Sequence, residues 1–85
     1  MAEDLKKRLD DLDGSLAEFD ASQTAPAAIG KVYNALLEEA RRNHPGDAVL
    51  AAVEPVAFTS AESEFAEINV GALRAMIQQI RNAIA

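Results

Sequence analysis

The chain has 85 residues, of which 14 are acidic, 8 are basic and none is cysteine, and its formal net charge is −6. This length allows a single domain, and the lack of cysteine excludes disulfide bonds and thiolate-bound zinc. The negative charge opposes binding to nucleic acid and to anionic membranes, and no apolar run approaches the ~20 residues that a membrane-spanning helix needs.

The first predicted helix runs from about Glu3 to Asp20. Its apolar residues follow a heptad spacing, which is typical of a helix that packs against a partner helix. These residues are Leu5, Leu9, Leu12, Leu16 and Phe19. Gly14 weakens the helix, and Ser15 and Glu18 have the spacing of a capping box, so the sequence also allows a break and a new start at this point.

Residues 21–25 form a predicted linker, in which Ser22 or Thr24 can cap the helix that follows. Pro26 disfavours helical geometry at the residue before it but suits a first helical turn. The second predicted helix therefore runs from about Pro26 to Asn43. Its apolar positions recur with the helical period, and they are Ile29, Val32, Tyr33, Leu36, Leu37 and Ala40.

A short third helix is predicted from Ala48 to Glu54, because Asp47 is a good N-cap and Pro55 stops the helix.

Residues 56–68 allow two interpretations. We favour a loop that is fixed to the core by three apolar side chains and followed by Asn69 as the cap of the last helix. The three side chains are Phe58, Phe65 and Ile68. The alternative is one long helix that starts near Ser60 and continues to the end of the chain.

The last predicted helix runs from about Asn69 to Ile84. Its apolar residues fall within an arc of roughly 100°, and they are Leu73, Met76, Ile77, Ile80 and Ile84. Arg74 and Arg81 line one flank of this helix. They are candidates to bind carboxylates of a partner, and the alternative is that they lie in solvent beside Glu64 and Glu67.

These elements predict an all-α fold, a small three- to four-helix bundle with an amphipathic N-terminal helix. Residues 1–85 form one helical domain, in which 1–20 are the amphipathic helix, 21–25 the linker and 26–85 the helical core. The abundant alanine favours helices, and the small share of aromatic residues, 5%, argues against a sheet.

One stretch of the first helix resembles part of a calcium-binding EF-hand loop. The matching positions are Asp11, Asp13, Gly14 and Leu16. Two positions depart from the loop, because Leu9 stands where the first carboxylate ligand is needed and Asp20 replaces the last glutamate. We therefore interpret the stretch as an acidic, solvated helix face, and a degenerate calcium-binding protein is a less favoured function.

No candidate catalytic residue emerges from the sequence. His44 is the only histidine, and the Pro45–Gly46 pair after it explains it as the end of the second helix. A catalytic or metal-binding histidine needs converging partners, and the four glycines do not form a phosphate-binding loop. We therefore expect a protein that is not an enzyme, with no metal and no cofactor.

The predicted function is a protein–protein interaction or self-assembly module. Its partner is another protein or a second copy of the chain, so a homo-oligomer is expected, and neither nucleic acid nor a membrane is a partner. The predicted interaction residues are Leu5, Leu9, Leu12, Leu16, Phe19, Arg74 and Arg81. The acidic start does not resemble a secretory signal, so we expect a cytoplasmic location.

Two alternatives remain open on the sequence alone. The first helix is either an arm that pairs with another chain or a helix that closes the bundle of its own chain. The function is either the module just described or an acidic regulatory protein that binds a basic partner, for which the only motive is the net charge.

Overall fold

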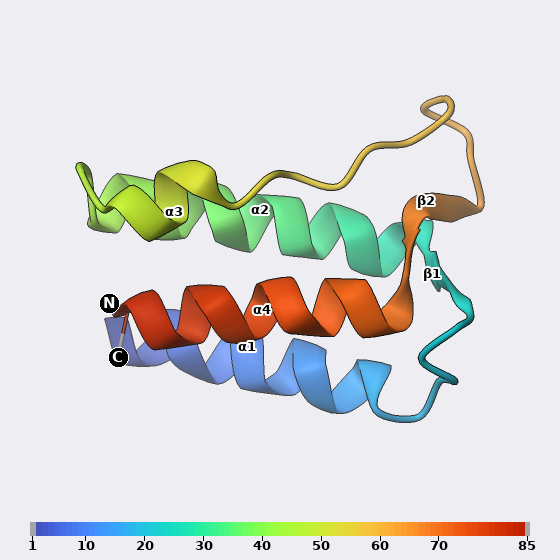
Figure 1. Cartoon of the computed structure of the whole chain (residues 1–85), viewed down its shortest axis with the longest axis horizontal. Coiled ribbons are helices and arrows are strands. Elements are labelled where there is room, and N and C mark those ends of the chain that lie inside the picture. The colour runs from blue at the N-terminus through green and yellow to red at the C-terminus, as the bar shows by residue number, and fades with distance from the viewer. Residues whose placement is uncertain (1, 85) are drawn as a thin grey trace.

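A computed structural model describes residues 2–84 and shows a mostly helical chain with one small sheet (Figure 1). The elements in chain order are α1 (Ala2–Leu16), β1 (Thr24–Pro26), α2 (Ala27–Asn43), α3 (Ala48–Ala52), β2 (Phe65–Asn69) and α4 (Val70–Ile84). The four predicted helices are confirmed. The all-α prediction is wrong in one respect, because two strands form where a linker and a loop were predicted.

The three long helices form the body of the protein (Figure 1). α1 runs antiparallel to both α2 and α4 and packs against both. α3 contacts α2 and α4, and the extended segment after it runs back along α2. The two strands lie at the end of the bundle where α1 ends and α2 and α4 begin, so this end is built from irregular backbone and the sheet.

The helix starts follow from local chemistry. The Asp47 carboxylate caps α3, as predicted, by accepting hydrogen bonds from the backbone N–H groups two and three residues later, at 2.9 and 3.1 Å. Asn69 Oδ1 accepts a hydrogen bond from the Ala72 N–H at 2.8 Å, which confirms the predicted cap of α4. By contrast, α2 begins after Pro26 with no side-chain cap, so the predicted cap from the linker is absent.

Two alternatives that the sequence left open are absent from the structure. α1 continues through Gly14 to Leu16, and the Ser15 hydroxyl donates back to the Asp11 carbonyl oxygen at 3.1 Å instead of capping a new helix. The alternative long helix from residue 60 is also absent, because α4 starts at Val70 and a strand precedes it.

The leucines of α1 lie in the core of their own chain. Leu5, Leu9 and Leu16 are fully buried, Leu12 is 7% exposed, and Phe19 packs against the same core while partly buried. Of the two interpretations of this helix, the structure therefore shows the one in which it closes an intramolecular bundle. The heptad pattern correctly indicated that α1 packs against other helices, and these helices are α2 and α4 of the same chain.

The two strands pair antiparallel, with Thr24 opposite Asn69 and Pro26 opposite Phe65. Beside the strands, the Val70 N–H donates to the Gln23 carbonyl oxygen at 2.8 Å. These bonds join the end of the predicted linker to the start of α4.

β2 has one inward and one outward face. Ala66 is buried and Ile68 is partly buried against the core, whereas Phe65, Glu67 and Asn69 are exposed, as the period of two in a strand requires. The prediction that Phe65 packs on the core is therefore wrong. The same prediction is confirmed for Ile68 and also for Phe58, which is partly buried against the core.

Gly30 of α2 allows the sheet to lie close to the helix. A Cβ atom at this position would be 3.1 Å from Ala66 Cβ and 3.1 Å from the ring of Phe58. A side chain there would push β2 and the segment before it away from the core.

Candidate interaction surface

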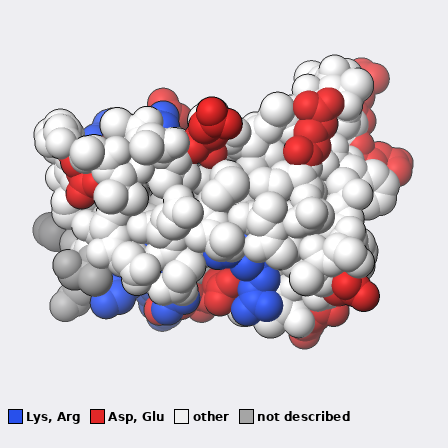
Figure 2. Space-filling model, in the orientation of Figure 1, with Lys and Arg blue, Asp and Glu red and all other residues white. Residues whose placement is uncertain are grey.

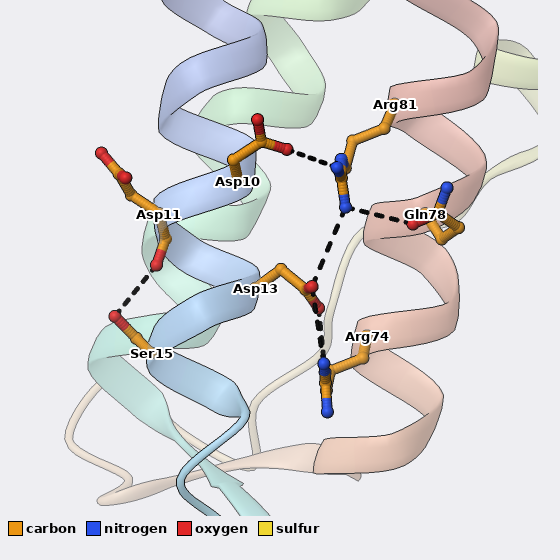
Figure 3. Close-up of polar contacts among 7 residues, drawn as sticks. All are labelled: Asp10, Asp11, Asp13, Ser15, Arg74, Gln78 and Arg81. Carbon is orange, nitrogen blue, oxygen red and sulfur yellow. Dashed lines mark hydrogen bonds and ion pairs between the residues drawn. The ribbon is translucent and has the colours of Figure 1, made fainter.

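The predicted interaction residues separate into two groups in the structure. The α1 leucines are inside the protein, so a partner cannot reach them while the chain is folded. Arg74 and Arg81 are on the surface of α4, but they face α1 and not a partner (Figure 3). A binding surface therefore has to be looked for elsewhere.

Arg74 and Arg81 join α4 to α1 through aspartates (Figure 3). Arg74 Nε lies 2.9 Å from Asp13 Oδ1, and Arg81 lies 2.6 Å from Asp10 Oδ1 and 3.8 Å from Asp13 Oδ2. The hydrogen bond and the charge of Asp13 raise the pKa of Arg74. Both arginines thus pair with aspartates of their own chain and form no ion pair with Glu64 or Glu67, and both side chains remain partly exposed to solvent.

The stretch that resembles an EF-hand loop is helical from Leu9 to Leu16, so its matching positions lie on α1. Asp10 and Asp13 point toward α4, whereas Asp11 points to the other side of the helix (Figure 3). Among the described side chains, those of residues 4–84, no group of three or more histidine, aspartate or glutamate residues is placed to hold a metal ion. No helix in the same range is long and apolar enough to cross a membrane.

The negative charge is concentrated at the end of the bundle that carries the strands. We call this region, residues 17–26 and 57–69, the acidic end. It contains five of the 14 acidic residues and none of the 8 basic ones, so it accounts for all but one unit of the net charge of −6. The five acids are Glu18, Asp20, Glu62, Glu64 and Glu67. Figure 2 shows red side chains gathered at this end, while the blue side chains lie along the helices.

None of these five acids forms an ion pair with a described residue, whereas Asp4, Asp10, Asp13 and Glu39 all pair with arginines. Asp20 accepts hydrogen bonds from the backbone N–H and the hydroxyl of Ser22, at 3.0 and 2.9 Å, and these bonds lower its pKa. Asp20 is therefore fully ionised at neutral pH. The charge of the acidic end is left for solvent or for a partner.

An aromatic side chain is exposed within the acidic end. Phe65 is 51% exposed, with Glu64 beside it in sequence and Glu67 on the same face of β2. Together with Gln23 and Thr24 it lines a shallow hollow of about 310 Å³. The sequence did contain a sign of the strand, because the apolar Ala66 and Ile68 alternate with the polar Glu67 and Asn69.

Comparisons with protein-family models, with curated proteins and with solved structures gave no significant match. The surface must therefore be judged by its own chemistry. It offers unpaired carboxylates around an exposed aromatic ring, which is suited to binding a cationic surface that has an apolar component.

Proposed function

We propose that the protein is a non-enzymatic interaction module that binds a basic protein partner through its acidic end, and that it acts in the cytoplasm. The observation that carries this proposal is the uneven distribution of charge. The helical body is close to neutral and four of its nine acids pair with arginines, whereas the acidic end has five acids and no base.

Such a distribution favours a basic partner for two reasons. Opposite charges on two surfaces steer their encounter and raise the association rate, and like charges on a wrong partner oppose it. Carboxylates that form no ion pair with a described residue also have no such pair to break when they meet a cation. Nucleic acid and anionic membranes are repelled by the same charges, so the partner is expected to be a protein.

The surface that was predicted for self-assembly, the leucine stripe of α1, is not accessible to a second copy of the folded chain. The leucines that were to pair between copies are buried in one chain, and two acidic ends of the same sign repel each other. We therefore favour a different protein, with basic character, as the partner.

The test is the binding of a short fluorescent peptide of alternating lysine and serine, measured by anisotropy at low salt. One variant removes three charges from the acidic end, with the substitutions Glu62→Gln, Glu64→Gln and Glu67→Gln. A matched control removes three exposed charges from elsewhere on the protein, with Asp11→Asn, Glu38→Gln and Glu54→Gln. None of these six acids forms an ion pair with a described residue.

Both variants have the same net charge, so a difference between them reports the place of binding. We expect the first variant to bind roughly tenfold more weakly than the wild type and the control to change by less than about threefold. Equal weakening in both variants would show that only the total charge matters and would refute the assignment to the acidic end.

A further inference from the structure

The exposed ring of Phe65 adds a feature that charge alone does not require. Large apolar side chains exposed on a small protein are common singly, but this one lines a hollow and has carboxylates around it. The hollow is walled by the Phe65 ring and by the exposed side chains of Gln23 and Thr24. Its two polar walls offer no charge, so the hollow itself does not attract a cation.

The strand pairing fixes this arrangement. Pro26 lies opposite Phe65 in the register of the sheet, and the Ala27 N–H donates to the Glu64 carbonyl oxygen at 2.9 Å. The ring is therefore held on a paired strand and not on a free loop, which lowers the entropy lost when a partner covers it. A rigid, half-exposed aromatic is the kind of residue that anchors protein interfaces.

We propose that this hollow binds one apolar side chain of the basic partner, so that the recognised element is a cationic segment with an apolar residue between its cations. This inference rests on the proposed function, because the same acidic end supplies the charge contacts. The carboxylates of Glu64 and Glu67 then meet the flanking cations while the apolar side chain covers the Phe65 ring.

The experiment compares two peptides on each protein. One is the alternating lysine–serine peptide, and the other has its central serine replaced by leucine. The ratio of their affinities is measured for the wild type, for Phe65→Ala and for Val49→Ala. Val49 is a matched control, because it is 49% exposed but lies on α3, outside the acidic end. Partial unfolding lowers both affinities equally, so the ratio reports the contact even if a variant is less stable.

We expect the wild type and Val49→Ala to bind the leucine peptide roughly tenfold more tightly than the serine peptide. In Phe65→Ala this ratio should fall below about threefold. The ratio in the wild type should also persist when salt is raised, while both affinities fall, because only the charge contacts are screened.

Three results would overturn the inference, and they are distinguishable. If neither peptide binds the wild type, the proposed function fails and the inference with it. If both peptides bind the wild type equally, binding is by charge alone and only the inference fails. If the affinity ratio in Phe65→Ala stays near that of the wild type, the leucine of the peptide does not contact the Phe65 ring, and only the inference fails.

Discussion

Replacement of Leu9 by alanine tests whether α1 is part of the core. Leu9 is fully buried and belongs to the same apolar cluster as Leu37 of α2 and Ile77 of α4. A leucine-to-alanine change at such a site costs about 2–5 kcal/mol, because the lost burial adds to the cavity left behind. An 85-residue domain has a total stability of about 4–13 kcal/mol, so the variant should lose a large part of it.

The assay is urea unfolding followed by circular dichroism. With a slope of about 1 kcal/mol per molar urea for a chain of this size, the Leu9→Ala midpoint should fall by about 2–5 M, or the variant should be unfolded without urea. Lys7→Ala on the exposed face of α1 is the control and should shift the midpoint by less than about 0.5 M. If the two variants have the same midpoint, α1 is a dispensable arm and the structure of the core given above is wrong.

Three further predictions concern pH, backbone and charge. Burial raises the pKa of Tyr33 from 10.0 to about 12, so the unfolded chain ionises first. The unfolding free energy should therefore fall by about 1.4 kcal/mol per pH unit between about pH 10 and pH 12, and Tyr33→Phe should remove this step from the pH profile. Gly14→Ala should raise the urea midpoint, since nothing lies within 4 Å of the added Cβ in a helix interior and alanine is favoured there by about 1 kcal/mol. Gly30→Ala should instead lower the urea midpoint, because its Cβ would be 3.1 Å from two side-chain atoms. A shift of the midpoint in the same direction for both glycine variants would contradict this reasoning. Arg81→Met should lower the free energy of unfolding by about 1 kcal/mol in low salt and by much less in 1 M salt, because it removes partly exposed ion pairs to α1. A loss that does not change with salt would show that Arg81 does not stabilise the fold through these ion pairs.

The helices were predictable because their determinants are local. Apolar periodicity identified the three long helices, and the Asp47 cap and Pro55 identified the short one. The caps Asp47 and Asn69 are adjacent in sequence to the helices that they start. What the sequence left open was the partner of α1. A heptad stripe shows that a helix packs against another helix, but it does not show whether that helix belongs to the same chain.

The strands and the binding surface were harder to predict for a physical reason. β1 has only three residues and contains a proline, so its strand geometry depends on pairing with residues some 40 positions away and not on local preference. The position of the acidic end also depends on contacts between segments that are far apart in the sequence. Glu18 and Glu64 are far apart in the sequence, and only the reversal of the chain between α1 and β2 brings their segments to one end of the bundle.

The roles of Arg74 and Arg81 also depend on this long-range packing. From the sequence, their nearest acids are Glu64 and Glu67, but the helix carries both arginines along the flank that faces α1. Glu64 and Glu67, the acids nearest to these arginines in the sequence, therefore form no ion pair with a described residue. The ion pairs with α1 therefore engage both cations of α4, while the charge of the acidic end follows from its five acids and its lack of basic residues.

The most direct test of this account is to map where a basic ligand binds, by recording amide chemical shifts of the ¹⁵N-labelled protein while the lysine–serine peptide with a central leucine is added. The account predicts that the largest shifts occur in the acidic end, residues 17–26 and 57–69, with Phe65 and its neighbours among them, and that the helical body changes little. Shifts centred on α3, or in the groove between α1 and α2 that Leu12 and Val32 line, would contradict the assignment of the acidic end as the binding surface.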